Sequence, residues 1–252
     1  MTELTFQSWL VLCALILGGM VFIALFFISV PYGRHFRGGW GASLPSYLGW
    51  MIMEAPAALL FAVFFWLGNT KNLVACLFLA MWEMHYIHRA FIYPLTLSDG
   101  RKKMPVLVLC MAFLFNIGNA YNNGRYLFTL SGGYPQSWLI DPRFLCGLAV
   151  FLAGYTINRW ADHRLRGLRK PGEIGYRIPY GGLYQWVSCP NYLGEIIEWC
   201  GWALATWSLP GLVFAIWTVA NLAPRARSHH AWYRQHFPDY PPERKALIPG
   251  IW

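Results

Sequence analysis

Several residues that could do chemistry stand inside apolar segments of this chain. Glu54 interrupts one such segment, and Tyr86 lies in the next, beside His85 and Arg89. Ionisable side chains within membrane spans are costly, so each is a functional hypothesis. A tyrosine hydroxyl next to a carboxyl group can hydrogen-bond a substrate carbonyl and polarise an enone without water. We therefore predict that Glu54 and Tyr86 act together; the alternative is a purely structural pairing between helices.

A later apolar segment carries two more carboxylates. At about 100° per residue, one helical stripe holds Glu195, Glu198, Trp199 and Trp202. Carboxylates on this stripe should not face lipid. Two interpretations stay open: they bind hydroxyl or amide groups of a ligand, or they pair with arginines of the long polar stretch before this segment.

That polar stretch, residues 158–191, is the longest interruption between apolar segments. Its first part continues a helix, and one face of this helix holds Asn158, Asp162, Arg166 and Arg169. Asn and Asp beside several Arg suit ribose hydroxyls next to phosphates. The alternative is a solvated charged face.

The second part of the stretch contains Gly181-Gly182, which allows close backbone approach to a ligand. The chain has no G-x-G-x-x-G after a strand and no G-x-x-x-x-G-K-[ST]. A nucleotide, if bound, is therefore not bound by a Rossmann or P-loop unit.

The composition says which elements must position these residues. Only 12% of the 252 residues are charged and 57% are hydrophobic, whereas soluble proteins are about one quarter charged. This predicts an all-α, polytopic membrane protein with a single domain, 1–252. Seven transmembrane helices are expected at residues 8–30, 45–67, 72–93, 104–121, 143–159, 192–209 and 211–223, the last ending before Pro224.

Charge gives the predicted orientation. The connections that contain the polar stretch and the C-terminal tail hold fifteen Lys and Arg, and the opposite set holds three. By the positive-inside rule the N-terminus is outside and the C-terminus cytosolic. Lys and Arg outnumber Asp and Glu by 20 to 11, which suits anionic lipid headgroups or a phosphorylated ligand. The long apolar runs disfavour nucleic acid.

The metal-ligating residue types form no convincing set. Six Cys show no C-x-x-C spacing, and we interpret them as small apolar filler. His229, His230 and His236 are loosely spaced like ligands, but no Cys or carboxylate completes a set. We expect no metal, and expect the tail to cap a cytosolic pocket.

Several motifs resemble one known family. The run RKPGEIGYRIPYGGLYQWVSCPNYLGEIIEWCGWALATWSLP and the end RKALIPGIW resemble the C-terminal half of steroid 5-alpha-reductases, in near register over residues 155–252. HYIHRAFIYPL at 85–95 and Glu54-Ala55-Pro56 reinforce this resemblance. It implies a seven-helix membrane enzyme that reduces the 4,5 double bond of 3-oxo-4-ene steroids with NADPH, with hydride to C5 and a proton to C4.

The resemblance also implies roles for individual residues. Glu54 and Tyr86 would hold the 3-oxo group and stabilise the enolate. Residues that match cofactor positions are Arg101, Asn158, Asp162, Arg169, Tyr176, Arg177, Asn191, Glu195, Arg225, His229 and Tyr233. The steroid pocket would be lined by Trp50, Phe115 and Trp217. Residues 8–121 would then form the substrate side, and residues 143–252 the cofactor side.

Departures from the pattern leave the preferred lipid open. Met53 stands before Glu54 where family members often carry Gln, and Ser188-Cys189-Pro190 deviates locally. The alternatives are a reductase of another enone or of a polyprenol lipid, a membrane methyltransferase that uses S-adenosylmethionine, and a non-catalytic sterol-binding scaffold. We expect a monomer, in the cytoplasmic membrane of a bacterium or the endoplasmic reticulum of a eukaryote.

Overall fold

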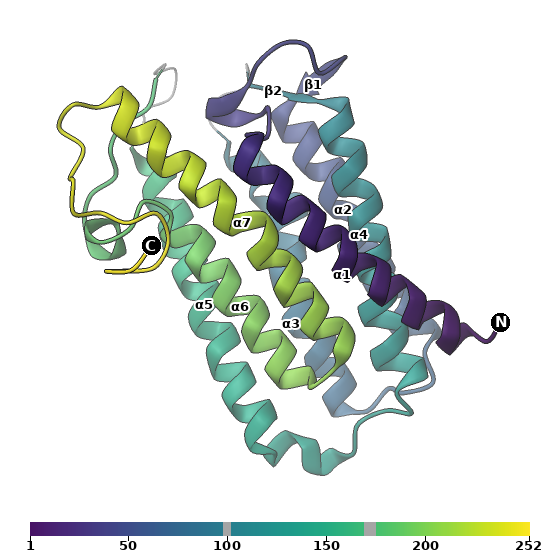
Figure 1. The fold of residues 1–252 in the computed structure, drawn as a ribbon. Helices are drawn as coiled ribbons and strands as arrows, with labels where there is room; N and C mark the ends of the chain where they lie inside the picture. Colours follow the sequence, from purple (N-terminus) through teal and green to yellow (C-terminus); the bar gives the residue numbers. More distant parts are fainter. Residues whose placement is uncertain (98–101, 169–174) are drawn as a thin grey trace.

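The computed structural model describes residues 1–97, 102–168 and 175–252, and these form a bundle of long helices (Figure 1). Arg101 and Arg169 lie outside the described residues. Seven α-helices are present in the described part: α1 (Glu3–Phe27), α2 (Ser46–Leu67), α3 (Leu73–Ile87), α4 (Val106–Arg125), α5 (Pro142–Gly167), α6 (Pro190–Thr206) and α7 (Leu209–His236). They coincide with the seven predicted segments, mostly within a few residues at each start.

Helix starts are specified locally. The side chains of Asn72, Asp141 and Ser208 accept hydrogen bonds from backbone amides in the first turns of α3, α5 and α7. Helices α2 and α4 instead begin directly after two short antiparallel strands, β1 (Ser43–Pro45) and β2 (Lys103–Pro105). This pairing fixes the starts of α2 and α4 side by side, at the same end of the bundle.

Two helices continue past their α-helical part as short π-helices. The segment His88–Ile92 extends α3, and Tyr126–Leu130 extends α4. A π-helical turn inserts residues into the helical repeat and is frequent at functional sites. The side chains from His88 onward therefore point in other directions than the regular helix predicted for the third span would give them, and Arg89 is one of them.

Helices α5 and α6 pack backbone to backbone, and Figure 1 shows them side by side. A Cβ at Gly154 would lie 2.2 Å from the backbone nitrogen of Glu198, and one at Gly194 would lie 2.4 Å from that of Asn158. Gly147 and Gly201 make equally close approaches along the same interface. Small residues permit this contact in membrane helices. The contact brings Asn158 of α5 next to Asn191 and Glu195 of α6.

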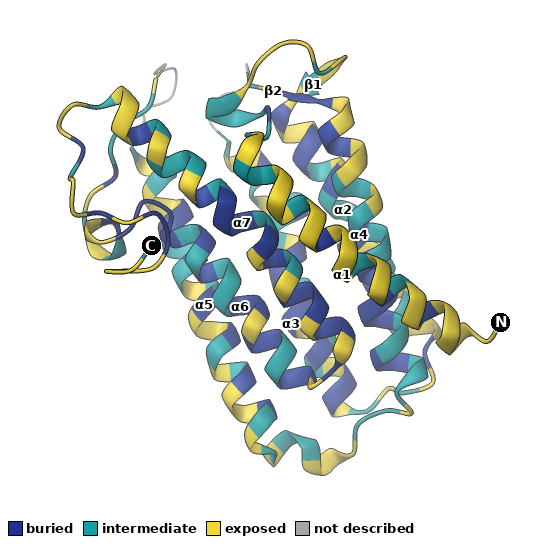
Figure 2. Ribbon diagram, in the orientation of Figure 1, coloured by how far each residue is buried: buried dark blue, intermediate teal, exposed yellow. Residues whose placement is uncertain are grey.

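The apolar core lies between α2, α3, α5, α6 and α7. It is rich in aromatic rings: Phe61 stacks on Trp82 at 4.3 Å, and Trp202 lies 5.3 Å from Trp82. Helix α1 packs differently, because most of its surface is exposed (Figure 2).

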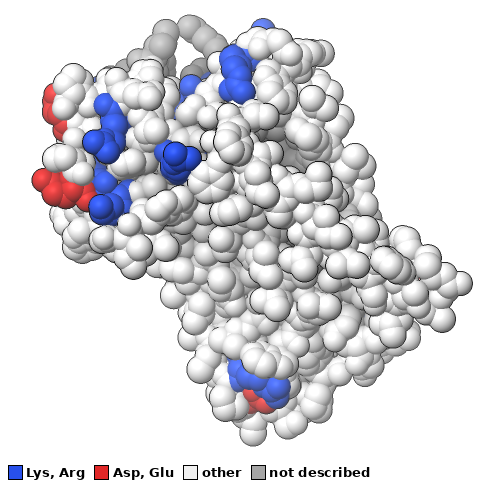
Figure 3. Space-filling model, in the orientation of Figure 1, with Lys and Arg blue, Asp and Glu red and all other residues white. Residues whose placement is uncertain are grey.

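Within the described parts of the chain, four helices are long and apolar enough to cross a membrane: α1, α2, α5, and α4 with its π-helical extension. On the face shown in Figure 3, charged side chains gather at the two ends of the bundle and the band between them is uncharged. Both observations support a helical membrane protein.

The seventh helix does not end before Pro224, as the sequence predicted. Helix α7 continues through Pro224 to His236. Proline removes one backbone hydrogen bond and usually kinks or ends a helix. Here Pro224 is buried and its neighbours Ala223 and Ala226 pack in a small core with Cys189, Tyr192 and the C-terminal tail, and this tertiary packing holds the helix together.

Candidate functional site

A cavity of about 220 Å³ opens at the end of the bundle that holds the basic connections. Its walls come from the end of α1 and the turn after it, the start of α2, the π-helix after α3, the end of α5, the loop at Tyr176 and Arg177, the start of α6, and α7. Of the predicted cofactor residues, those that line it are Asp162, Tyr176, Arg177, Asn191, Arg225, His229 and Tyr233.

A chain of polar contacts forms the base of this cavity. Asn191 donates to Asp162 Oδ1 at 3.2 Å, and Asn158 donates both to the Asn191 carbonyl at 3.0 Å and to Glu195 Oε2 at 3.3 Å. Arg89 lies 3.5 Å from Asp162 and 3.9 Å from Glu195. Asn158 and Asp162 are each only 4% exposed, so the alternative of a solvated face is wrong for these two residues. We call these five residues the cradle.

The cation in the cradle comes from an unexpected place. Among the described residues, the arginine beside Glu195 is Arg89, which belongs to the π-helix after α3 and not to the polar stretch. Its guanidinium also lies over the rings of Trp50 at 4.4 Å and Tyr93 at 4.9 Å. Arg89 therefore balances two carboxylates from α5 and α6 and joins them to α2.

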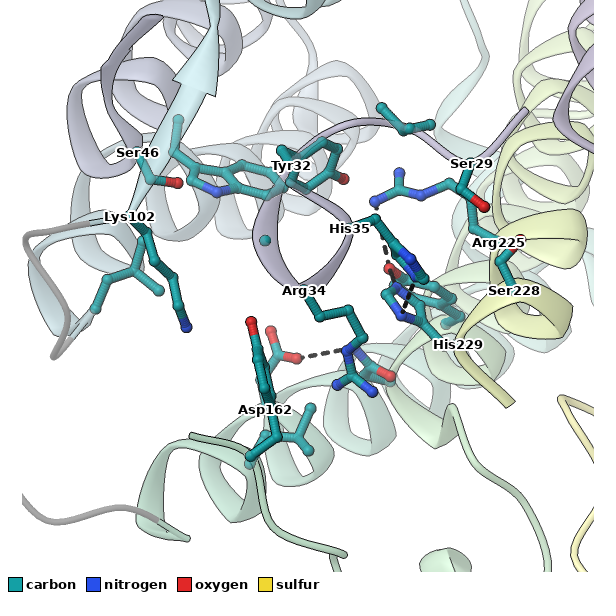
Figure 4. Close-up of a pocket in the computed structure, with 18 of the residues that line it drawn as sticks. Ser29, Tyr32, Arg34, His35, Ser46, Lys102, Asp162, Arg225, Ser228 and His229 are labelled. Atoms are coloured by element: carbon teal, nitrogen blue, oxygen red, sulfur yellow. Dashed lines mark hydrogen bonds between the residues drawn. The ribbon is translucent and has the colours of Figure 1, made fainter. Parts of the chain in front are cut away.

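Further cations surround the same space. Figure 4 shows Arg34, Lys102 and Arg225, from three separate segments, around the space that Asp162 also borders. Arg34 donates to the Tyr233 hydroxyl at 3.1 Å and lies over the rings of Tyr233, Trp232 and Tyr176. Arg34 was not predicted as a site residue, although it belongs to a basic connection.

The residues present fit a phosphorylated dinucleotide. Arg34 and Arg166, which line the cavity, each keep one buried guanidinium nitrogen without a hydrogen-bond partner. Asp162 Oδ2 also has no hydrogen bond, although it lies 3.5 Å from Arg89. Buried polar atoms of this kind normally have partners. Arginine nitrogens match phosphate oxygens, and a carboxylate oxygen matches a ribose hydroxyl.

Two histidines meet at the cavity wall. His35 Nε2 lies 3.3 Å from His229 Nδ1, and His229 Nε2 lies 3.0 Å from the Tyr192 hydroxyl. Burial and the nearby charges of Arg34 and Arg37 lower the pKa of His35 to about 4. His35 is therefore neutral at pH 7 in the ligand-free protein.

Glu54 and Tyr86 are both held by helix α4. Asn116 donates to Glu54 Oε2 at 3.1 Å, and Asn119, nearly one turn further along, donates to the Tyr86 hydroxyl at 3.5 Å. Glu54 interacts electrostatically with Tyr86 and with Arg89. Both predicted residues are thus bonded to the same helix, Glu54 through Asn116 and Tyr86 through Asn119.

Glu198 has a partner that sequence did not predict. Its Oε1 lies 2.9 Å from His85 Nδ1, and the Glu198 side chain is fully buried. The Trp199 ring packs on His85 at 4.7 Å and on Tyr86 at 5.7 Å. This pair ties α6 to α3 behind Tyr86.

The three predicted steroid-lining aromatics occupy two places. Phe115 and Trp217 stack at 4.6 Å between α4 and α7, and Trp217 also faces Gly18 of α1. Trp50 lies apart from them in the cavity wall, under Arg89 and against Tyr93. Among the described residues, no group of three or more His, Cys, Asp or Glu could hold a metal ion.

Fold and site together define a helical membrane-type protein with an arginine-lined cavity and, near it, the partly buried Glu54 and the buried Tyr86. The family model described as 3-oxo-5-alpha-steroid 4-dehydrogenase matches residues 102–252. The chain is 42% identical over 244 residues to 3-oxo-5-alpha-steroid 4-dehydrogenase 1 of Bos taurus, covering 95% of this chain and 93% of that protein.

Plant and human relatives are equally similar. Identity is 43% to steroid 5-alpha-reductase DET2 of Gossypium hirsutum, over 91% of each chain, and 43% to 3-oxo-5-alpha-steroid 4-dehydrogenase 1 of Homo sapiens, over 87% of this chain and 85% of that protein. The chain belongs to the 3-oxo-5-alpha-steroid 4-dehydrogenase family, a family of oxidoreductases that act on CH–CH groups. The predicted resemblance is confirmed.

Proposed function

We propose that this chain reduces the 4,5 double bond of 3-oxo-4-ene steroids to 5-alpha-3-oxo steroids, with NADPH as the reductant. The observation that carries this proposal is the position of Glu54 and Tyr86. Both are held by α4, and Arg89, which interacts with Glu54, also pairs with the carboxylates of the cradle and lines the cavity. Arg89 therefore connects the proposed carbonyl-binding pair with the proposed cofactor site.

Bound NADPH would supply the hydride that C5 receives, while a proton reaches C4. Tyr86 donates a hydrogen bond to the 3-oxygen, and Glu54, with its carboxyl group protonated, donates a second one from α2. Their task is to stabilise the negative charge that develops on that oxygen as the double bond is reduced. The aromatic rings of Trp50, Phe115 and Trp217 exclude water and hold the steroid rings.

The cradle and the cations around it would hold the cofactor. Asp162 and Asn191 suit ribose hydroxyls, and the unpartnered nitrogens of Arg34 and Arg166 suit phosphates, including a 2′-phosphate. The other predicted cofactor residues are Arg101, Asn158, Arg169, Tyr176, Arg177, Glu195, Arg225, His229 and Tyr233. In this proposal residues 8–121 hold the substrate and residues 143–252 hold most of the cofactor.

We also propose that all seven helices span the membrane, with the N-terminus outside and the C-terminus cytosolic. The support is the bias of Lys and Arg toward one set of connections. A membrane-impermeant thiol reagent added to intact cells should label a Lys71→Cys variant and should not label a Lys103→Cys variant. The reverse pattern would overturn the orientation.

The activity is tested with purified protein in detergent, NADPH, and testosterone or progesterone. We expect loss of the absorbance of both the cofactor and the enone. If neither is consumed while S-adenosylmethionine binds, the reductase proposal is wrong. A panel with a non-steroid enone and a polyprenol, compared by kcat/KM, separates the steroid from the alternative lipid substrates.

A further inference from the structure

Helix α4 carries a line of buried amides that leads to Tyr86. Asn116, Asn119 and Asn123 are 4%, 7% and 1% exposed. Buried polar side chains in a membrane helix are expensive unless they are hydrogen-bonded. These three are bonded in a definite direction, and the direction has a chemical consequence.

The direction is set by a tryptophan. The indole nitrogen of Trp202 donates to Asn123 Oδ1 at 3.0 Å. An indole N–H can only donate, so this amide must present its oxygen to Trp202 and its nitrogen to the other side. Asn123 Nδ2 then donates to the side-chain oxygen of Asn119 at 3.0 Å and to the Asn119 backbone carbonyl at 3.1 Å. A backbone carbonyl only accepts, which independently fixes the same orientation.

The same logic passes to Tyr86. Because Asn119 Oδ1 already accepts from Asn123, Asn119 turns its Nδ2 to the Tyr86 oxygen, at 3.5 Å. A phenol hydroxyl can both donate and accept. In this series of hydrogen bonds the Tyr86 oxygen accepts, so the hydrogen of the Tyr86 hydroxyl is left for another acceptor.

We propose that the chain Trp202–Asn123–Asn119 is a positioning device that orients the Tyr86 hydroxyl, with its oxygen accepting from the protein and its proton free for the substrate carbonyl. This inference rests on the proposed function, in which Tyr86 donates to the 3-oxo group. Trp202, Asn123 and Asn119 do not line the cavity, and in this proposal they act through Tyr86.

Asn116 gives Glu54 a similar fixed partner. Its Nδ2 donates to the Met53 backbone carbonyl at 2.7 Å and to Glu54 Oε2 at 3.1 Å. The carbonyl fixes the amide orientation, so one Glu54 oxygen always faces a donor. Asn116 and Asn119, nearly one turn apart on α4, thus each present a hydrogen-bond donor to one member of the Glu54–Tyr86 pair.

Asn122 does not belong to this line of hydrogen-bonded amides. It is also buried on α4, but its side-chain oxygen has no hydrogen-bond partner. Its backbone carbonyl accepts from Gln7 of α1 at 3.5 Å. Asn122 therefore offers a matched control for any change made to Asn119 or Asn123.

The test compares Trp202→Phe, Asn119→Leu, the double variant and the control Asn122→Leu. Trp202→Phe removes the indole donor and keeps an aromatic ring in the core. We expect Asn119→Leu to lower kcat about tenfold, the effect of one buried hydrogen bond. Trp202→Phe should lower kcat by a smaller factor, because the Asn119 backbone carbonyl still holds Asn123. KM for the steroid should change less than kcat. The double variant should lose no more than Asn119→Leu alone, since both changes break one chain of hydrogen bonds. Asn122→Leu should keep the parent kcat.

A second measurement does not need turnover. In the parent, the carbonyl stretch of a bound, isotope-labelled 3-oxo-4-ene steroid should be lowered in frequency by the Tyr86 hydrogen bond. We expect the shift to shrink in Trp202→Phe and Asn119→Leu and to persist in Asn122→Leu. Should Trp202→Phe fail to fold, Asn123→Leu removes the same link of the chain.

The outcomes separate this inference from the proposed function. If Tyr86→Phe keeps the parent kcat and carbonyl stretch, the role of Tyr86 is wrong and the inference falls with it. If Tyr86→Phe loses activity while Trp202→Phe and Asn119→Leu keep both readouts, the role of Tyr86 stands and the positioning chain is refuted. Additive losses in the double variant would also refute it, because independent packing defects add.

Discussion

The two halves of the site stabilise their polar side chains with different kinds of partner. The cradle holds formal charges: Arg89 lies between Asp162 and Glu195, and further arginines surround the cavity above them. The inner site holds Glu54 and Tyr86 with neutral amides, Asn116 and Asn119. The difference lies in the partners: the carboxylates of the cradle share one cation, whereas the inner pair receives uncharged amide donors from α4.

Removing the Tyr86 hydroxyl should give the largest effect and tests the inner site alone. We expect Tyr86→Phe to lower kcat about 100-fold or more, as for loss of an oxyanion-stabilising donor. NADPH affinity should stay within twofold of the parent, since the cradle is untouched. Single-turnover kinetics and cofactor titration measure the two quantities. A large loss of cofactor affinity would show that the two regions are not separate.

Removing the charge shared by the two regions comes next. Arg89→Met leaves Asp162 and Glu195 without their cation, and breaking a buried pair costs about 3–5 kcal/mol. We expect a clearly lower unfolding temperature and NADPH binding weakened about tenfold or more, since the cradle loses its charge balance.

The control for this change is Arg143→Met. Arg143 pairs with Asp141 at 2.8 Å, but its side chain is 41% exposed, and exposed pairs contribute little. We expect no change in NADPH affinity and no resolvable change in melting. Equal effects of the two variants would mean that Arg89 has no special place in the site.

The packing that assembles the cradle can be tested through glycine. Gly154→Ala puts a Cβ against the backbone of α6 and should force α5 and α6 apart, at a cost of about 1–3 kcal/mol. Gly19→Ala on α1 meets no atom within 4 Å and should be neutral. Thermal unfolding in detergent measures both. Similar melting of the two variants would contradict the close approach of α5 and α6.

The smallest expected effect is a pH dependence of NADPH affinity that arises from His35 at the cavity wall. The pKa of His35 is about 4 in the free protein, and a bound phosphate should raise it. The complex then binds more protons than the free protein at pH values between the two pKa values. His35 should therefore add to NADPH affinity as pH falls toward 5, by a few-fold.

A His35→Gln variant isolates this contribution, because the titration of the cofactor itself is common to both proteins. The NADPH dissociation constant of the variant, divided by that of the parent, should increase as the pH falls from 7.5 to 5. A constant ratio would place His35 away from the phosphates.

Sequence predicted the elements well and their partners poorly. Apolar segments located all seven helices, and the resemblance named Asp162, Asn191 and Glu195 in one group that the structure joins by hydrogen bonds and ion pairs. Arg34 and Asn119 were missed. Arg34 had a signal in the basic connection before β1, whereas Asn119 looked like one more polar residue in an apolar helix.

What the sequence determined by itself is local: the helical segments, the charge bias between their connections, and the residue types available for chemistry. Only the tertiary structure decided that Arg89 is the cation of the cradle, that Glu198 pairs with His85, and that α7 continues through Pro224. The physical reason is that apolar periodicity depends on neighbours three or four residues away. Partners depend on how helices rotate and how closely they pack, which here is set by the glycine contact of α5 with α6 and by the π-helical turn after α3.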